Sequence, residues 1–338
     1  MKKIIIAFLL SSIAIGVNAK DGATTSKDLI VIKLSHVVSE GAPKGQAAIK
    51  FKQLMESRFP GRVKVEVYHN NTLFKDNEEI EALELGVVDV ILPTFGKVAG
   101  VYNVKEFGIF DLPFLFSSDN DIKKYINSVP GTKLLNILGQ KDPNIEGVAY
   151  WPNAFRSFSG PVPFKNPNDL KPYAFRIESE SMGNFYNSLG VKQTVKLAFA
   201  DLPKALKKEG EYKLDGAENP LSNFMGSKLY ESQKYITLSR HSYNGYLFLA
   251  NKHWLNKLPA DIKDGFSNAA KESGQYAMDV SLANEEKVLQ QIKEKGVRVY
   301  NWTPEEKKSF KMSAIKVHEK FMLDVNKDFL LETYSAIK

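Results

Sequence analysis

The stretch LIVIKLSHV (residues 29–37) begins the pattern that decides the fold. Its run of β-branched and other apolar residues is typical of a buried strand. In the next segment, apolar residues recur on one face of a helix, from Ala47 to Phe59. RVKVEVY (62–68) then alternates apolar and charged residues with a period of two, as a strand with one exposed face does. We therefore expect strand, helix and strand in this order.

The alternation continues with EEIEALELG (78–86), which predicts a short helix that ends at Gly86. VVDVILP (87–93) predicts another buried strand. Together the five segments give the order β-α-β-α-β, which predicts an open α/β sheet with helices on its faces.

A second α/β set begins near residue 146, with a strand in GVAYW (147–151). Further strands are expected around Arg176, in VKQTVKLA (191–198) and in NGYLFLAN (244–251), with a helix around 181–189. No internal repeat and no low-complexity linker separates the two sets, so ordered segments must connect them.

Two helices are expected near the C-terminus. The segment from Pro259 to Gly296 has no further proline and an intermittent apolar face, and a helix of this length extends past one small domain. Thr303-Pro304-Glu305-Glu306 is a capping box with proline at the first helical position, which predicts the start of another helix.

The N-terminus has the three parts of a secretory signal peptide. Lys2 and Lys3 precede the apolar run IIIAFLLSSIAIGV (4–17), and small residues stand at Val17 and Ala19. The alternative is a membrane anchor, but the run contains serines and is short for a span of about 20 apolar residues. We expect export to the periplasm, with cleavage after Ala19.

Composition excludes several classes of protein. The chain has 338 residues and no cysteine, so thiol catalysis and Cys-metal sites are excluded, and an exported protein of this kind is stabilised by burial alone. The whole chain has 46 basic and 39 acidic residues. Removal of residues 1–19 takes away Lys2 and Lys3, which leaves 44 basic residues and a formal charge of +5. This mild charge is spread along the chain, and nothing in it indicates nucleic acid.

Catalytic and metal-binding motifs are missing. The five histidines, His36, His69, His241, His253 and His318, form no HxH, HExxH or i,i+4 pair. There is no GxSxG or Walker sequence, and no GxGxxG follows a strand. We expect no metal and no cofactor.

Arg176 is the first candidate site residue, because it lies between Phe175 and Ile177 in a stretch that reads as a half-buried strand. Arginine keeps its charge in proteins, so a buried one needs an anion beside it. That anion is either a bound solute or a carboxylate of the protein. The structural alternative is a pair with Glu178, which we expect on the same strand face and exposed to solvent.

Three more cations lie near strand ends: Arg156 in WPNAFRSFSG, Lys97 after the strand 87–93, and His36 at the end of the first strand. Ligands of open α/β sheets bind beyond the carboxyl ends of the strands, so these positions suggest a shared cleft. A structural role remains the alternative for each.

DGAENPLSNF (215–224) combines a turn at Asp215-Gly216 with Asn219 in front of Pro220. An asparagine fixed there can donate to a carboxylate oxygen, and the alternative is a helix N-cap. Phe199 either packs on a ligand or closes the core.

The chain resembles the solute-binding proteins of TRAP transporters, a family that includes C4-dicarboxylate and sialic-acid binders. The likeness covers roughly residues 30 to 325 and rests on these segments: KLSHVVSEGAPKGQAAIKFKQLMESRFPGRVKVEVYHNNTL, NEEIEALELGVVDV, FDLPFLF, FRIESESMGNFYNSLGV, LAFADLPKAL, DGAENPL and YLFLANKHWLNKLPADIKDGFSNAA.

The resemblance implies a clamshell of two α/β domains that encloses its ligand, with the helix after Pro259 running across both. We expect domain I in residues 30–152 and 245–284, and domain II in residues 153–244 and 285–338. The resemblance also implies that the protein, as a monomer, captures an organic anion by domain closure and delivers it to membrane permease subunits.

The family's ligand residues map onto this chain as follows. The arginine that forms the salt bridge to the ligand carboxylate is Arg176, and the asparagine is Asn219. A second arginine near the ligand is Arg156, and a ligand-facing aromatic residue is Phe199. Positions that vary with the substrate are His36, Thr94 and Lys97.

The match has departures. The connector 207–214 is longer than usual, and Thr94 stands where sialic-acid binders carry an acidic residue, which argues against that ligand. Trp151, next to the cleft segment, favours a planar or larger substrate. A C4-dicarboxylate is the first expectation, and a sugar acid or keto acid stays open.

Two other functions also remain open at this point. One is an exported enzyme for organic acids that uses Lys97 or His36 as a base, although the missing nucleophile and metal motifs argue against it. The other is a subunit that presents its ligand to a sensor.

Overall fold

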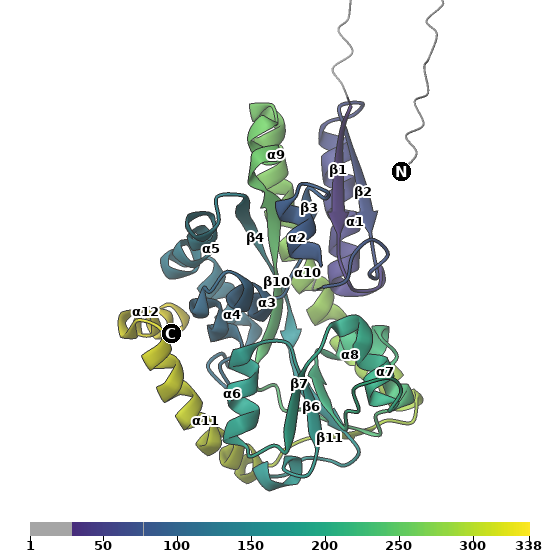
Figure 1. Ribbon diagram of the computed structural model, residues 1–338, viewed down its shortest axis with the longest axis vertical. Helices are drawn as coiled ribbons and strands as arrows, with labels where there is room; N and C mark the ends of the chain where they lie inside the picture. The colour runs from purple at the N-terminus through teal and green to yellow at the C-terminus, as the bar shows by residue number, and fades with distance from the viewer. Residues whose placement is uncertain (1–28, 77) are drawn as a thin grey trace, which may run out of the picture.

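The computed structural model describes residues 29–76 and 78–338, and it shows two lobes, one above the other in Figure 1. The first lobe is built on a five-stranded sheet and the second on a four-stranded and a two-stranded sheet. The expected α/β fold with two lobes is confirmed. The signal peptide and its cleavage site lie outside the described residues.

The sheet of the first lobe is mixed. Its strands lie in the order β2 (Val63–Tyr68), β1 (Ile30–Ser35), β3 (Val90–Ile91), β10 (Tyr243–Asn251) and β4 (Ile145–Phe155). Strand β1 is parallel to β2 and β3, whereas β10 is antiparallel to β3 and β4. The third strand is shorter than the predicted 87–93, because only Val90 and Ile91 pair with β1 and β10. A helix capped by Thr94 begins soon after it.

Strand β4 runs on into β5 (Ser157–Gly160), which belongs to the second lobe. The four-stranded sheet there has the order β11 (Arg298–Tyr300), β9 (Tyr235–Thr237), β5 and β8 (Ala217–Asn219). The parallel pair β6 (Ala174–Ile177) and β7 (Gln193–Lys196) adjoins it through a bridge from Phe175 to Gly216. The predicted strand around Arg176 is therefore confirmed as β6.

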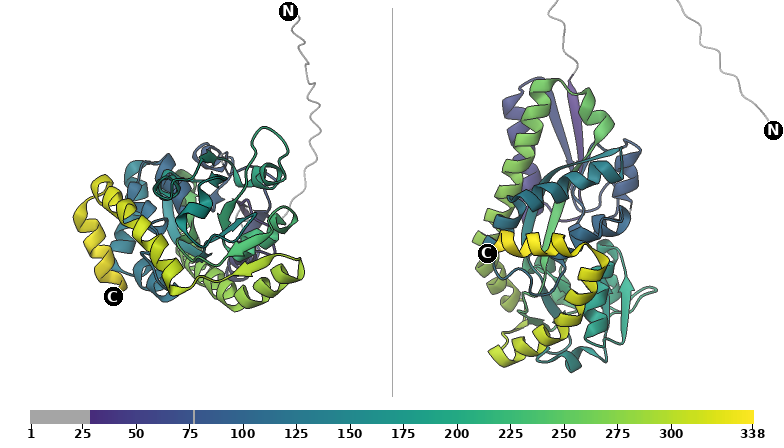
Figure 2. Two further views of the ribbon diagram at one scale, coloured as in Figure 1. Left: turned by 90° about the horizontal axis from the view of Figure 1, so that it is seen from below. Right: turned by 90° about the vertical axis from the view of Figure 1, so that its left-hand side faces the viewer.

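Helices cover the faces of the sheets in both lobes (Figures 1 and 2). Those of the first lobe are α1 (Pro43–Arg58), α2 (Glu79–Glu84), α3 (Phe95–Val101), η1 (Lys105–Phe110), α4 (Asp119–Ile126), α5 (Val129–Lys141) and α9 (Lys252–Lys257). Those of the second are η2 (Pro167–Leu170), α6 (Glu180–Ser188), η3 (Phe199–Asp201), α7 (Leu202–Leu206), α8 (Leu221–Gly226) and η4 (Leu229–Glu231). As predicted, Gly86 follows α2 with a positive φ of 70°.

The long helix is α10 (Ala260–Glu294), with 35 residues. It packs against α1 and β4 of the first lobe and against α8 of the second. Its close approach to β4 requires a glycine at position 274, because a Cβ there would lie 2.3 Å from the carbonyl oxygen of Tyr150. The expected helix across both lobes is thus present.

Two further helices follow, α11 (Pro304–Asp324) and α12 (Lys327–Ile337). The capping box predicted at Thr303 is formed, with Glu306 as its reciprocal partner. Helix α11 packs on α6, and α12 crosses to α4 and α5. The division into two domains stays a proposal, and we move α12 to the first lobe because of these contacts.

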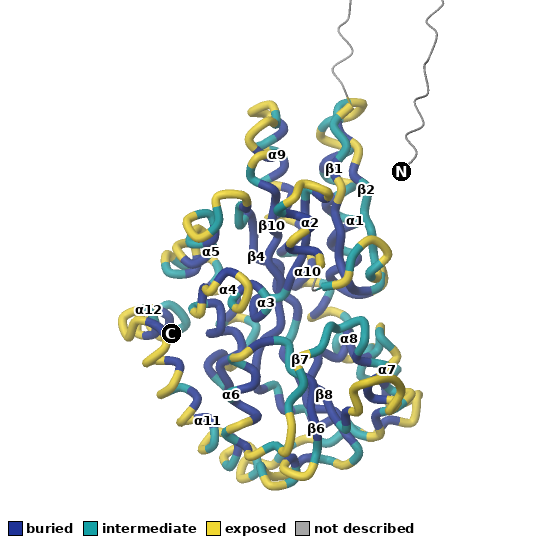
Figure 3. Tube along the Cα trace, in the orientation of Figure 1, coloured by how far each residue is buried: buried dark blue, intermediate teal, exposed yellow. Residues whose placement is uncertain are grey.

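Buried apolar residues fill both lobes, and the dark blue trace in Figure 3 runs through each. One cluster lies between the first sheet, α1 and α10, and another between α7, α8 and the end of α10. The largest cluster joins residues of both lobes, from Phe95 and Phe110 to Phe158, Phe175 and Phe310. Because its aromatic rings come from both lobes, the lobes share part of one core. No helix in the described residues combines the length and apolarity needed to cross a membrane.

Candidate functional site

A cavity of about 30 Å³ lies between the lobes. From the first lobe it is lined by the start of α1, the loop before α2 and the turn into α3, and from the second by the end of β6, by η3 and by β8 with the start of α8. A single water needs roughly 10–15 Å³ of such volume. The cavity is therefore small and nearly closed.

Arg176 reaches this cavity from β6, and only 3% of the residue is exposed. Its Nε donates to the carbonyl oxygen of Leu197 at 3.0 Å, and its Nη1 donates to Glu178 at 3.3 Å. Within the described residues these bonds use Nε and Nη1, which leaves Nη2 for a further acceptor. The ring of Phe199 lies beside the guanidinium, 5.8 Å from its carbon atom.

Only 9% of the Glu178 side chain is exposed, and this corrects the expectation that it faces solvent. Its Oε1 accepts a short hydrogen bond from Arg156, and its Oε2 accepts from Arg176. Burial opposes ionisation, but the two guanidinium groups outweigh it and hold the pKa of Glu178 below its usual range. The side chain therefore stays charged and joins two buried arginines.

Arg156 also lines the cavity, but the protein already satisfies its charge. Besides Glu178, its Nη1 donates to Asp111 at 2.6 Å and its Nη2 to the side-chain oxygen of Asn244 at 2.9 Å. Despite burial, which lowers it, the pKa of Arg156 is raised by the carboxylates of Glu178 and Asp111. Because Asp111 also accepts from Ser179 on the other lobe, this network ties the two lobes together behind the cavity.

Asn219 lies at the end of β8 and lines the cavity. Its side-chain Nδ2 is buried and has no hydrogen-bond partner among the described residues. The alternative role as a helix cap is not observed, because Pro220 is the N-cap of α8 and no side chain caps that helix. A buried amide N–H without an acceptor in the protein is unfavourable, and a ligand oxygen in the cavity would satisfy it.

Thr94 and Lys97 face the cavity from the first lobe. Thr94 caps α3 and accepts from the backbone N–H of Lys97 at 3.3 Å, which fixes the turn. The Nζ of Lys97 lies 3.6 Å from the carboxylate of Asp76. That carboxylate also accepts from the backbone N–H of Phe199, at 3.2 and 3.3 Å, so it bridges the lobes.

His36 and Trp151 lie outside the cavity lining. His36 is fully buried; its Nδ1 accepts from the N–H of Val38 at 3.3 Å, and its Nε2 lies 2.8 Å from Nδ1 of His69. Burial, with the nearby charge of Lys44 and His69, lowers its pKa well below the usual value. Trp151 is fully buried in the core and donates to the carbonyl of Ala270 at 2.8 Å. The structure therefore gives no support for a substrate contact by Trp151, because its ring packs inside the lobe.

The cavity has lining residues that the sequence did not reveal. They include Lys44, Asp76, Glu79, Glu218, Asn223 and Tyr246. Lys44 and Asp76 stand in polar stretches that resemble solvated helix starts and loops, so nothing in their spacing marked them. Glu218 directly precedes Asn219 in the chain, and its Oε2 lies 2.8 Å from Nε2 of His241.

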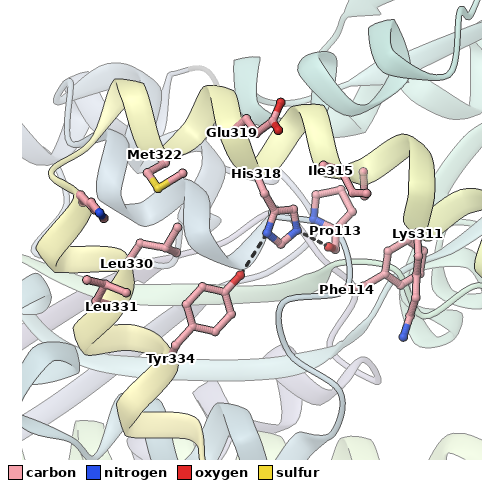
Figure 4. A pocket seen from close by; sticks show the side chains of 12 residues that line it. Pro113, Phe114, Lys311, Ile315, His318, Glu319, Met322, Leu330, Leu331 and Tyr334 are labelled. Carbon is pink, nitrogen blue, oxygen red and sulfur yellow. Dashed lines mark hydrogen bonds between the residues drawn. The ribbon is translucent and has the colours of Figure 1, made fainter.

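A second cavity, of about 400 Å³, lies between α11, α12 and the loop at Phe114 (Figure 4). It shares no lining residue with the first. Its central polar group is His318, whose Nε2–H donates to the carbonyl of Pro113 at 2.7 Å and whose Nδ1 lies 3.2 Å from the hydroxyl of Tyr334. Both ring nitrogens are occupied, and the remaining walls are mainly apolar. Residues 29–76 and 78–338 contain no group of three His, Asp or Glu side chains that could hold a metal ion.

The matching family model is that of the bacterial extracellular solute-binding proteins, family 7, and it covers residues 34–324. The chain belongs to this family. A related protein, the C4-dicarboxylate-binding periplasmic protein DctP of Rhodobacter capsulatus, is 37% identical over 311 residues, which cover 91% of this chain and 90% of that protein.

Solved structures agree with this assignment. A TRAP periplasmic solute-binding protein from Shewanella oneidensis with bound succinate is 32% identical, has a TM-score of 0.86, and is matched over 92% of this chain and 100% of its own. The sugar-acid-binding protein of Advenella mimigardefordensis in complex with galactonate is 28% identical, has a TM-score of 0.85, and is matched over 92% and 99%. The chain is thus a TRAP-type solute-binding protein and not an enzyme, which confirms the expectation from the sequence.

Proposed function

We propose that the protein is the exported solute-binding subunit of a TRAP transporter. It captures a C4-dicarboxylate or a related organic anion between its lobes and delivers it to membrane permease subunits. The family membership supports this role, and so do relatives that bind C4-dicarboxylates and succinate. It acts as a periplasmic monomer after cleavage at Ala19.

In this proposal Arg176 and Asn219 hold one carboxylate of the solute. The observation that carries the assignment is that a buried guanidinium and an unpartnered buried amide line the same cavity. The Nη2 of Arg176 donates to the solute carboxylate in a charge-assisted hydrogen bond, and the amide of Asn219 adds a second donor. Glu178 orients Arg176 and Phe199 covers its face, so the donors are positioned before the solute arrives.

Closure is the second part of the proposal. A solute stabilises the closed form only if it interacts differently with the closed and open states. The contacts between Asp76 and the N–H of Phe199, and between Lys75 and Asp201 at 3.5 Å, join the first lobe to the second at the rim of the cavity. They add to the solute's own contacts when the lobes meet.

The cations on the walls of the cavity favour a short dicarboxylate over a sugar acid. A short dicarboxylate places many charged oxygens in little space, which suits the several cations on the walls. A sugar acid needs room and hydrogen-bond partners for a row of hydroxyl groups.

Calorimetry with the Arg176→Ala variant tests the proposal. Removing a buried charge partner reduces binding free energy by roughly 3–5 kcal/mol, so succinate or malate binding falls below detection if the wild-type affinity is micromolar. The matched control is Arg298→Ala, at an exposed arginine of β11. Unchanged affinity in Arg176→Ala, with the control also unchanged, rejects the assignment. If the wild type binds galactonate more tightly than any dicarboxylate, the proposed solute is a sugar acid instead, and the role as a solute-binding subunit stands.

A further inference from the structure

Lys44 is a buried lysine at the start of α1, on the lobe opposite Arg176. Only 2% of the residue is exposed, and it lines the cavity. Its Nζ donates to the carbonyl oxygen of Leu92 at 3.0 Å and lies 3.8 Å from the centre of the Tyr246 ring. An ammonium group has three N–H donors, so these contacts use only part of its capacity.

The charge of Lys44 lacks a close partner in the protein. In the described part of the chain, no carboxylate oxygen lies within 4 Å of its Nζ, whereas Lys97 pairs with Asp76 and Arg156 with Asp111. A buried ammonium group without an adjacent anion is strongly unfavourable.

The more distant charges around Lys44 come from several elements. Glu79 of α2, Asp76 before that helix and Glu178 after β6 attract it, and the charge of Lys44 helps to lower the pKa of His36, which follows β1. Glu79 is held away by its hydrogen bond to Ser35, at 2.9 Å. These carboxylates do not offset burial, which lowers the pKa of Lys44 to about 8.

We propose that Lys44 binds the far carboxylate of a dicarboxylate whose near carboxylate is held by Arg176 and Asn219. This inference rests on the proposed function and narrows its solute class. Two cations on opposite walls of one small cavity match a dianion. A monoanion leaves one of them, Lys44, buried and unpaired. The dianion also connects the lobes directly, since one end binds the second lobe and the other binds the first.

The proposal has a consequence for pH. Without an anion, Lys44 releases its proton near pH 8, and a bound carboxylate raises its pKa. Binding of a dicarboxylate therefore takes up protons above that pH, and the affinity falls as the pH rises from 7 to 9.5. A monoanion that does not reach Lys44 shows no such fall.

The test compares succinate with succinamate, its monoamide, which has the same shape and one charge fewer. Isothermal titration calorimetry is carried out with wild type, Lys44→Met and the control Lys52→Met, a partly exposed lysine on the same helix that pairs with Glu56. In Lys44→Met we expect succinate affinity to fall about 100-fold, as for loss of one partner in a buried charge pair. Succinamate affinity changes little, and Lys52→Met behaves as wild type.

Equal weakening of both ligands in Lys44→Met overturns the inference, because Lys44 then only supports the cleft. Succinate affinity that stays constant from pH 7 to 9.5 in the wild type also overturns it, and this measurement needs no variant to fold. In both cases binding by the wild type leaves the proposed function standing. A wild type that binds no carboxylate at all overturns the proposed function as well.

Discussion

We expect the carboxylate of Glu178 to stabilise the folded protein and to weaken solute binding. The Glu178→Gln variant tests both effects. The substitution keeps the shape and one acceptor oxygen but removes the charge between Arg156 and Arg176. Two charge-assisted hydrogen bonds then become bonds to a neutral acceptor. Each loses about 1 kcal/mol, so we expect unfolding free energy to fall by about 2 kcal/mol. Arg156 keeps Asp111, which limits the loss.

The effect on binding has the opposite sign. Glu178 competes with a solute carboxylate for Arg176 and repels it. Two like charges about 7 Å apart at an effective dielectric of about 20 interact by roughly 2 kcal/mol. We therefore expect Glu178→Gln to bind succinate roughly 30-fold more tightly than wild type.

Urea unfolding gives the stability and calorimetry gives the affinity. The matched control is Glu231→Gln, which removes an exposed carboxylate paired with Lys207 and is expected to change neither quantity appreciably. Weaker succinate binding by Glu178→Gln would refute this reasoning. It would mean that orienting Arg176 matters more than the competing charge.

Two further substitutions test the closure contact and the buried histidine. Asp76→Ala removes the acceptor for the N–H of Phe199 and the partner of Lys97. We therefore expect about tenfold weaker solute binding and faster solute dissociation in stopped-flow fluorescence. The control is Asp264→Ala, at an exposed position, and dissociation kinetics of Asp76→Ala that match this control would contradict a role in closure. For His36, the pKa is lower in the folded than in the unfolded chain, so the unfolded chain binds more protons below pH 6.5. This histidine therefore contributes stability that is present above about pH 6.5 and is lost as the pH falls toward 5, and His36→Asn should flatten that part of a urea-unfolding series. An identical slope in wild type and variant would show that another group with a lowered pKa, such as His69, controls it.

Local patterns in the sequence predicted most of the fold. Strands β1, β2 and β3, the helix α10 and the capping box at Thr303 follow from hydrophobic period and terminal residues, which depend on near neighbours in the chain. The pattern placed the segments of β4 and β10 in a second set, whereas the structure has both in the first sheet. The extent of β3 and the contact of α12 with the first lobe depend on distant segments, and these were not predictable.

The candidate site shows the same division. Arg176 and Asn219 were noticeable because a charge in an apolar strand and an amide before proline are unusual locally. Lys44 was not, since a lysine in the first turn of a helix is ordinary, and the residues that enclose it, such as Leu92 and Tyr246, are distant in the sequence. Trp151 was misplaced because neighbours in a strand point to opposite faces, and its ring packs toward α10 rather than the cleft.

The continuous helix α10 limits how far the lobes can separate. Sharp bends in helices occur mainly at proline or at Gly/Ser pairs. Helix α10 has no proline, and its Ser273-Gly274 pair is held against Tyr150 and Trp151 of β4. Flexing must therefore occur beyond this point, in the turns that lead to Ile292 and the second lobe. In the proposed closure, the stiffness of those turns sets the amplitude of opening, and with it the time for which a captured molecule stays enclosed.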